Sequence, residues 1–386
     1  MLRHASFTSQ CARALKDNMR DMRNTRDTGL NIAFIYDPKA YYLERGYSET
    51  DCADLADEVT VKAVTNALCK LGHSVISVPG IKHLVAHLEA GEEKNWDLVF
   101  NFSEGVRGSA RESQVPALLE AYGVLYTFSD AATLTMCIDK AKTKMLLQHY
   151  RIPTSPFELV PKYGNKVDYS SLAKELSYPL FAKPTAASTS NGILPSNKII
   201  RHEDLEKTIE SLRCQFTSQD IILEEFLSGR EFTVAIFGNS SSATVLGALE
   251  MTWYNPEGHE NDTSIDFATS FSKAGRGPGQ DMGHVHADMA DPLVKTVADV
   301  ALSAYKVLRC RDAARVDIRL SSQKDNSVPY VIEVNPLFGL RDDYSLFTCI
   351  ARNNGLEYHD IIAGIIASAL QRRNVEDSGG GGVSSY

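Results

Sequence analysis

The order of secondary-structure signals along the chain predicts an α/β fold that becomes α+β in its C-terminal part. Over the first third, short apolar runs alternate with helical patterns, and this β-α-β-α-β order implies a parallel sheet covered by helices. Over the last third, β-rich segments outnumber the helical ones. The chain is therefore expected to begin with a parallel sheet and to continue with separate sheets and helices.

Each element of the first third is expected from a local pattern. The run NIAFIY is short and apolar throughout, as in a buried strand, and the next helix is marked by apolar residues at helical spacing and stopped by Gly72. Pro116 indicates a helix start or a kink. The expected strands are 31–36, 74–79 and 97–102, and the expected helices are 59–71 and 111–122.

The same patterns assign the rest of the chain. The stretch from Trp253 to Asp288 is rich in Gly, Asn, Asp, Ser and His, and a loop of this length inside a domain is usually functional or disordered. The expected helices are 139–150, 202–212, 291–308 and 359–372. The expected strands are 180–184, 221–225, 231–237, 243–251, 313–320 and 329–335.

The composition excludes several classes of protein. The chain has 386 residues, 43% hydrophobic and 23% charged, which is enough for about two to three globular domains. A net charge of −9 argues against a binder of DNA or RNA that neutralises phosphates over a broad surface, although a nucleotide pocket needs only a few cations. Ile361–Leu370 is too short to span a bilayer, so no membrane contact is expected.

The cysteines and the N-terminus indicate an intracellular protein. Seven cysteines with wide spacings and no CxxC pair favour reduced thiols over a disulfide framework or a zinc site. The first sixteen residues lack acids and resemble a mitochondrial transit peptide, but Asp17, Asp21 and Asp27 follow closely and favour a disordered cytosolic tail. A cytoplasmic location is expected, with mitochondrial targeting as the alternative.

Two positions carry the residue types that bind phosphate. Lys183 ends the strand LFAKP and precedes the small-residue loop Thr185–Gly192, whose N–H groups and hydroxyls could approach an anion closely. Lys140 lies near a helix start in IDKAKTK. An ordinary solvated loop and a solvated lysine are the alternatives, because neither segment is the GxxxxGK[ST] pattern.

A second group of residues fits a metal ion. Asp317 lies in RVDIRL, and Glu333 and Asn335 lie two residues apart in YVIEVNP, so they share one face of their strand. Three oxygen donors from neighbouring strands suit Mg²⁺. A salt-bridged strand face is the alternative, but two carboxylates on apolar strands are costly to bury without a cation.

The segment EEFLSGREF provides a third element. A strand that leads into a turn can hydrogen-bond a purine edge through its backbone, and a carboxylate a few residues later can bind ribose hydroxyls. Taken alone this signal is weak.

The order of these elements is more specific than any one of them, and it resembles the ATP-grasp enzymes, within them the D-alanine–D-alanine ligase-like group. The resembling text is FNFSEG, YTFSDAATLTMCIDKAKTKMLL, FAKPTAASTSNGI, ILEEFLSGREFTV, ARVDIRL and VIEVNPLFGL, which spans roughly residues 31 to 372. The resemblance implies an N-terminal parallel, Rossmann-like sheet followed by a two-lobed ATP-grasp fold. It divides the chain into a flexible tail at 1–29, a pre-ATP-grasp domain at 30–128, a central ATP-grasp lid subdomain at 129–227, a C-terminal ATP-grasp subdomain at 228–373 and a flexible tail at 374–386.

The resemblance also implies roles for single residues. Lys140 and Lys183 match the lysines that hold phosphates, Glu224, Glu225, Phe226 and Leu227 match the adenine segment, and Glu231 matches the ribose glutamate. Asp317, Glu333 and Asn335 match the ligands of Mg²⁺, which Mn²⁺ could replace. Arg315 and Gly339 match groups that stabilise the acyl phosphate and its tetrahedral intermediate, and Thr189 and Ser190 match hydroxyls that cover the γ-phosphate.

Departures from the family pattern concern the amino-acid side of the site. Glu104-Gly105 stands where the D-alanine ligases carry His-Gly, and Ser270-Phe271 stands where their lid carries Lys-Tyr, so Lys273 or Arg276 would have to supply the cation. The N-terminal glutamate that orients the first D-alanine has three candidate equivalents, Asp54, Asp57 and Glu58.

The substrate contacts are therefore expected to differ from those of D-alanine ligases. Glu104 could receive an amine and Arg341 a carboxylate, unless Arg341 only pairs with Asp342 or Asp343. Arg111, Glu112 and Ser345 could line the same pocket, or the first two could start a solvated helix.

These expectations describe an ADP-forming ligase that activates an amino-acid-like carboxylate as an acyl phosphate and joins it to an amine. The partners expected are small molecules, with a homodimer by resemblance only. The alternatives are an authentic D-alanine–D-alanine ligase, a non-catalytic ATP-binding regulatory protein, and a phosphoryl transfer to a hydroxyl.

Overall fold

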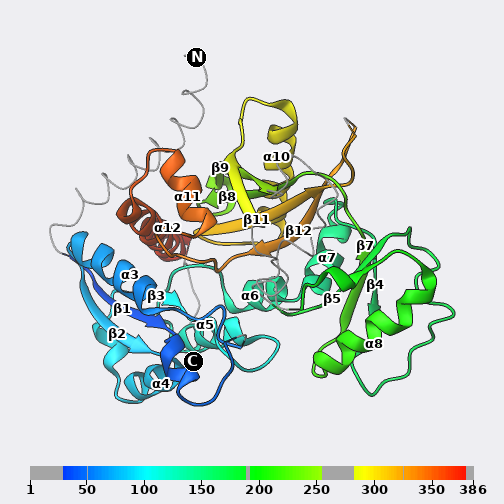
Figure 1. Ribbon diagram of the computed structural model, residues 1–386. Coiled ribbons are helices and arrows are strands. Elements are labelled where there is room, and N and C mark those ends of the chain that lie inside the picture. The colour runs from blue at the N-terminus through cyan, green and yellow to red at the C-terminus, as the bar shows by residue number, and fades with distance from the viewer. Residues whose placement is uncertain (1–28, 50, 188–191, 254–281, 325, 380–386) are drawn as a thin grey trace.

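The computed structural model describes residues 29–49, 51–187, 192–253, 282–324 and 326–379. These residues form three sheets with helices packed on them (Figure 1). No helix in these ranges is long and apolar enough to cross a membrane, and the cysteines within them are free. The predicted α/β class with an α+β C-terminal part is confirmed.

The N-terminal sheet is parallel, as the β-α-β-α-β order predicts. Its strand order is β2-β1-β3, and β1 lies in the middle because both neighbours pair with it in parallel register. Every residue of β3 is buried, as expected for a strand covered on both faces. The strands are β1 (Asn31–Tyr36), β2 (Ser74–Pro79) and β3 (Leu98–Phe102), and the helices are α2 (Lys39–Leu43), α3 (Glu58–Lys70), α4 (Ile81–Glu89) and α5 (Gln114–Ala121).

The second sheet is four-stranded and antiparallel, with the order β4-β7-β5-β6. Helix α8 packs on it, and α6 and α7 connect this lobe to the N-terminal sheet (Figure 1). The strands are β4 (Phe157–Val160), β5 (Leu180–Pro184), β6 (Lys198–Ile199) and β7 (Ile221–Glu225), and the helices are α6 (Ala131–Ile138), α7 (Lys140–His149) and α8 (Leu205–Gln215).

The third sheet is five-stranded and antiparallel, with the order β10-β9-β8-β11-β12. All seven residues of β8 are buried because helix α10 covers one face of the sheet and α11 and α12 pack on the other. The strands are β8 (Glu231–Phe237), β9 (Thr244–Trp253), β10 (Met282–His286), β11 (Ala313–Leu320) and β12 (Pro329–Asn335), and the helices are α10 (Pro292–Val307), α11 (Leu346–Asn353) and α12 (Tyr358–Gly379).

A chain of aromatic contacts joins the first sheet to the third. Phe100 on β3 packs edge-on against Phe128 at 5.9 Å between ring centroids, and Phe128 packs against Phe338 at 5.6 Å. Phe338 in turn stacks on Phe347 of α11 at 4.1 Å. Aromatic pairs at these distances stabilise a fold beyond the area that they bury. This packing fixes the N-terminal sheet against the C-terminal part.

Asp312 adds a polar connection at the same junction. Its fully buried carboxylate accepts hydrogen bonds from the Phe128 N–H at 2.8 Å and from Arg372 of α12 at 2.9 and 3.0 Å. Arg372 also donates to the Tyr126 carbonyl at 2.6 Å. Burial raises the pKa of Asp312, although Arg372 opposes this shift.

Several elements differ from the sequence expectations. Residues 81–89 and 131–138 form helices, and 157–160 forms a strand, where the sequence patterns assign none. The expected loop from Trp253 to Asp288 ends in a strand, since β10 pairs with β9 in antiparallel register. These elements are short, so their hydrophobic periodicity covers too few residues to distinguish them from loops. The domain boundaries stay predictions. The boundary predicted after residue 227 falls in the connection between β7, which ends at Glu225, and β8, which begins at Glu231.

Candidate functional site

The two lysines predicted to bind phosphate are Lys140 and Lys183. Hydrogen bonds at the start of α7 fix the backbone of Lys140. Asp139 caps α7 by accepting from the Ala141 N–H, and the Lys140 N–H donates to the Thr185 carbonyl at 2.9 Å, just past β5. The Lys140 Nζ then lies 2.8 Å from Glu333 and donates to the Ala187 carbonyl at 2.7 Å. Lys140 is therefore positioned by α7 and β5 and neutralised by β12.

Lys183 forms the second half of this arrangement. It lies on β5, which pairs with β7, and its Nζ is 2.5 Å from Glu224 on β7. The other Glu224 oxygen is 2.7 Å from the Nζ of Lys144 on α7. Burial alone would raise the pKa of Glu224, but the two ammonium groups outweigh it and lower the pKa to about 2. Glu224 is thus ionised between two lysines.

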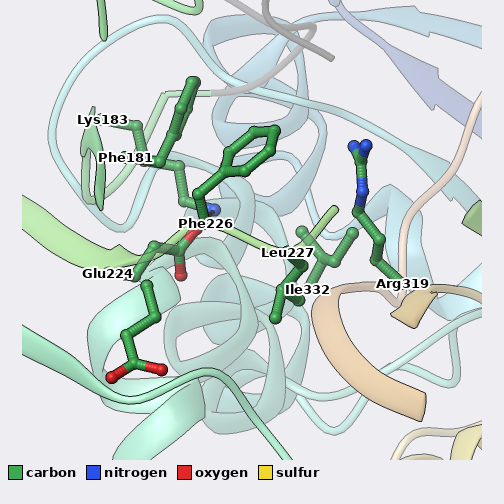
Figure 2. A pocket seen from close by; sticks show the side chains of 8 residues that line it. Phe181, Lys183, Glu224, Phe226, Leu227, Arg319 and Ile332 are labelled. Carbon is green, nitrogen blue, oxygen red and sulfur yellow. Dashed lines mark ion pairs between the residues drawn. The ribbon is translucent and has the colours of Figure 1, made fainter. Parts of the chain in front are cut away.

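A cavity lies beside this triad. It is a half-open hollow of about 300 Å³, a volume that includes open solvent, and its walls come from the second and third sheets. Figure 2 shows the Phe181 and Phe226 rings on one side and the Arg319 guanidinium on the other. Its lining consists of Phe181, Lys183, Glu224, Glu225, Phe226, Leu227, Arg319 and Ile332. All four residues of the predicted adenine segment line this cavity.

The predicted ribose glutamate lies next to it. Glu231 begins β8 and pairs with Arg319 of β11 at 3.1 Å, and both side chains are less than a tenth exposed. Burial raises the pKa of Glu231 to about 7, with Arg319 acting in the opposite direction. The pairing brings Glu231 to the cavity wall that Arg319 forms.

The third sheet brings together the metal candidates. In the ladder between β11 and β12, Asp317 lies opposite Glu333 and Arg315 lies opposite Asn335. The Asp317 carboxylate accepts from Arg315 at 3.1 Å, from Asn335 at 3.2 Å and from Thr233 at 2.6 Å. Asp317, Glu333 and Asn335 therefore lie close together, as the sequence predicted.

The charges on these two carboxylates differ. Burial raises the pKa of Asp317, and the neighbouring charge of Glu333 raises it further. The pKa of Glu333 is lowered, because Lys140, then Arg315 and Lys183, outweigh its burial. Two facing carboxylates with an amide offer the hard oxygen donors that Mg²⁺ prefers. Within the described ranges no group of three or more His, Cys, Asp or Glu has metal-binding geometry, so the set depends on the Asn335 amide.

Gly339 and Ser345 are held close together after β12. A Cβ added at Gly339 would lie 2.9 Å from the Ser345 Oγ, which accepts a hydrogen bond from the Arg341 N–H at 2.9 Å. Glycine is therefore needed where this turn passes the hydroxyl. Ser345 also precedes the first residue of α11.

Arg341 has two carboxylate partners already. Its guanidinium lies 3.0 Å from Asp343 and 3.1 Å from Asp57, and its side chain is 40% exposed. The local ion pair weighed from the sequence is present, and a second pair extends across to the N-terminal domain. Asp57 caps α3 with the same side chain, which accepts from the Thr60 N–H. Glu58, another candidate from the sequence, pairs with Lys62 on the surface.

The remaining substrate candidates lie in the segment between β3 and α5. Glu104 and Glu112 are each 8% exposed, and neither forms a hydrogen bond or an ion pair with another described residue. Burial raises the pKa of Glu104 well above its usual range, and the charges of Glu112 and Asp54 add to it. Burial raises the pKa of Glu112 to about 7, against the field of Arg111.

Arg111 is the cation of this group. It lies 3.3 Å from Asp54 and donates to the Ala186 carbonyl at 3.2 Å, next to the loop that follows Lys183. The field of Glu333 and Lys140 also acts on Glu112. The carboxylates of Glu104 and Glu112 therefore border the phosphate side of the site, and Arg111 does not start a solvated helix.

Some predicted residues lie outside the described residues. These are Thr189, Ser190 and the lid positions Ser270, Phe271, Lys273 and Arg276. Two buried cations were missed by the sequence analysis, Lys144 and Arg319. Lys144 follows Lys140 by one helical turn in DKAKTK, so both face the same side of α7. Arg319 follows Asp317 by two residues on β11 and shares its face in the ladder with β8. These spacings were the signals available.

Known proteins resemble this chain over most of its length. A family model described as D-ala D-ala ligase C-terminus matches residues 146–367. An uncharacterized protein of Sinorhizobium fredii, y4sG, is 28% identical over 317 residues, covering 80% of this chain and 87% of its own. D-alanine--D-alanine ligase B of Clostridium perfringens is 28% identical over 263 residues, covering 68% and 78%. The crystal structure of D-alanine--D-alanine ligase from Bacillus anthracis complexed with ATP has a TM-score of 0.65 at 20% identity, covering 90% of this chain and all of that one. The last comparison confirms the predicted fold.

Proposed function

Because the chain belongs to the D-ala D-ala ligase C-terminus family, we propose that it is an ATP-dependent ligase that joins an amino-acid-like carboxylate to an amine and releases ADP and phosphate. One observation carries this proposal. Lys140, Lys183 and Arg315 all act on the partly buried Glu333 carboxylate, beside a cavity lined by the segment predicted to bind adenine. Cations that converge on one point next to such a cavity suit a nucleoside triphosphate.

The chemistry explains why a triphosphate is needed. An amine does not displace oxygen from a carboxylate at neutral pH, because the carboxylate already carries negative charge. Transfer of the γ-phosphoryl group to a carboxylate oxygen releases ADP and forms an acyl phosphate. The amine then attacks the carbonyl carbon and loses a proton, a C–N bond forms, and the bond to the phosphate oxygen breaks. Lysines and arginine around the transferring group stabilise the charge that develops.

The lysines that form ion pairs in this site could bind a nucleotide by exchanging their carboxylate partners for phosphate oxygens. Lys140 now neutralises Glu333, and Lys183 neutralises Glu224. We expect both lysines to turn to phosphate oxygens when a nucleotide binds. This exchange would release Glu333 to a cation and Glu224 to the amino group of a purine. Lys144 would remain beside Glu224 as its counter-ion.

Asp317, Glu333 and Asn335 would hold the magnesium ion. Their oxygen donors fit a hard divalent cation, and the repulsion between Asp317 and Glu333 favours one. The ion, when bound, supplies positive charge to the phosphate oxygens. Arg315 and the Gly339 N–H would stabilise the negative charge on the carbonyl oxygen of the attacked substrate, and Thr189 and Ser190 would cover the γ-phosphate.

The amino-acid side supports a substrate that carries an ammonium group. Glu104 and Glu112 are buried carboxylates with no hydrogen-bond partner among the described residues, and a buried charge is stable only when it is paired or protonated. An ammonium group between them would provide that pairing. Arg341 and Ser345 would bind a carboxylate on the opposite side, after Arg341 exchanges one of its acidic partners. D-alanine itself remains the second candidate, since several of the relatives are named for it.

Product identification tests this proposal most directly. Purified protein with Mg²⁺-ATP is incubated with D- and L-amino acids and other small amines and acids, ADP release is measured, and products are identified by mass spectrometry. A product whose mass is the sum of two substrates minus water supports the ligase if Glu333→Gln does not form it. Glu250→Gln, a change on β9 away from the cavity, is the control and should still form it. D-alanine as the best substrate identifies a D-alanine–D-alanine ligase. ATP binding with no turnover on any substrate contradicts the ligase and supports a regulatory protein.

A further inference from the structure

Arg319 is a buried cation that lines the cavity, and no sequence motif predicted this position. It lies on β11 directly opposite Glu231 in the ladder with β8. Its guanidinium donates to the Glu231 carboxylate at 3.1 Å, and the side chains of Arg319 and Glu231 are 9% and 5% exposed. The pair is therefore held between the strands at the edge of the cavity.

The same guanidinium also forms a wall of the cavity. Its central carbon lies 5.5 Å from the centroid of the Phe226 ring, within the range of a cation–π contact. Phe226 belongs to the segment that lines the cavity, together with Leu227 and Ile332 below it (Figure 2). Arg319 thus contacts both the base side of the cavity, through Phe226, and the predicted ribose carboxylate, through Glu231.

Stability does not explain this arrangement. A buried ion pair is often no more stable than apolar side chains of the same volume, because both charges lose their hydration. The residues that line the cavity with Arg319 include Phe226, Leu227 and Ile332, so an apolar side chain would also pack at this position. The pair therefore has a use besides the packing of the sheet.

We propose that Arg319 is a nucleotide-positioning residue that holds Glu231 as a fixed acceptor for ribose hydroxyls and forms one side of the base pocket. The planar guanidinium provides several N–H donors in a fixed geometry, so it can orient one carboxylate while its face packs against an aromatic ring. Free to rotate or to take up a proton, Glu231 would accept the 2′-hydroxyl less well. The chain consequently selects ribonucleoside over 2′-deoxyribonucleoside triphosphates through this pair. The inference rests on the proposed function only in that the cavity binds a nucleotide.

Equilibrium binding measures this selection without any ligase turnover. Displacement of a fluorescent ATP analogue gives the Kd for ATP and for 2′-deoxy-ATP in wild type, Arg319→Met, Arg319→Lys and Glu231→Gln. A hydrogen bond to a charged group contributes about 1.5–3 kcal/mol, so wild type should prefer ATP by roughly tenfold or more. We expect Arg319→Met and Glu231→Gln each to reduce this preference to about twofold.

The matched control is Arg230→Met. Arg230 also pairs with a carboxylate on this sheet, Glu250, at 2.7 Å, but it does not line the cavity. It should keep the full preference for ATP. Arg319→Lys keeps a charge without the planar geometry and should retain an intermediate preference. The double variant Arg319→Met/Glu231→Gln should lose no more than either single one, because both act through one contact.

The outcomes separate two failures. A folded Arg319→Met protein, checked by its thermal unfolding transition, that keeps the wild-type ratio of the two Kd values overturns the role of Arg319. Should that variant not fold, an unchanged ratio in both Arg319→Lys and Glu231→Gln overturns it equally. Wild-type protein that binds no nucleotide contradicts the proposed function itself.

Discussion

The nucleotide side of the site and its amino-acid side differ in how their charges are balanced. Around the cavity, each buried carboxylate faces a cation within 3.1 Å, as in Glu224 with Lys144 and Lys183 and in Glu231 with Arg319. Between β3 and α5, Glu104 and Glu112 are buried with Arg111 as the nearest cation; Lys140 also acts on Glu112, and Arg111 already pairs with Asp54. One region is neutralised by the fold, whereas the other keeps excess negative charge for a proton or a ligand.

The difference teaches where each part of the function is specified. A balanced site can bind a nucleotide by exchanging partners, so its residues are set by the chemistry of phosphate and metal. An unbalanced site is stable only when something positive occupies it, so its residues are set by the particular substrate. This agrees with the sequence, in which the nucleotide motifs match the family and the amino-acid contacts depart from it.

The largest expected effect comes from breaking the balance on the nucleotide side. Lys144→Met leaves Glu224 with Lys183 alone, and removal of one partner of a buried ion pair costs about 3–5 kcal/mol. We expect the free energy of unfolding, measured by urea denaturation, to fall by this amount. Lys142→Met on the same helix, with its side chain 55% exposed, serves as the control and should change little. Equal stability of the two variants would refute the balanced triad.

Next in size is the loss of Arg315, which we expect to affect catalysis more than binding. Arg315→Met should lower kcat by roughly 10²–10³-fold, the usual cost of removing a group that stabilises a transition-state oxyanion. The Kd for ATP should change less than about threefold, since in the proposed function Lys140 and Lys183 hold the phosphates. Steady-state ADP release and equilibrium binding measure the two quantities. A large rise in Kd with kcat unchanged would assign Arg315 to binding instead.

The free energy of unfolding should depend on pH in opposite directions for the two regions. The pKa of Glu112 is raised to about 7 by burial, so the folded state binds its proton more tightly, and this stabilisation is present at low pH and lost as pH rises from about 4.5 to 7. Glu112→Gln should therefore reduce the loss of unfolding free energy over this range by at most about 3 kcal/mol.

The nucleotide side behaves in the opposite way. The pKa of Glu224 is lowered to about 2, so its stabilisation is present above the unfolded pKa of about 4.5 and lost as pH falls toward 2. Glu224→Gln should flatten the acid limb only. Denaturant titrations from pH 3 to pH 8 on both variants measure this, and parallel curves for the two would contradict the comparison.

The smallest effect is expected at Arg341. Its two ion pairs are partly exposed, and exposed pairs contribute about 0–1 kcal/mol. Arg341→Ala should leave the free energy of unfolding nearly unchanged but raise the KM of the substrate that supplies the carboxylate. Asp343→Ala controls for the local pair alone and should change neither quantity. An unchanged KM in Arg341→Ala would make this arginine a surface ion pair only.

Much of the site was accessible from the sequence because motif residues lie at fixed spacings on single strands. Asp317, Glu333 and Asn335 converge since RVD and EVN occupy paired strands, and the EEFL segment lines the cavity as expected. Lys144 and Arg319 were missed because a cation that pairs inside the protein has the same local pattern as a solvated one. The helix at 131–138 was missed because its apolar residues lie on all sides and give no clear period.

The sequence by itself determined the α/β to α+β change, most of the helices and strands, and the residues that we propose for the phosphate and metal chemistry, because periodicity and motif spacing act over short distances. Only the tertiary structure decided which charges neutralise one another. Lys140 meets Glu333 across nearly two hundred residues. Glu104 and Glu112 are buried near Arg111, which already pairs with Asp54. Burial and electrostatic pairing depend on distances in space, and the linear chain does not contain them until it folds.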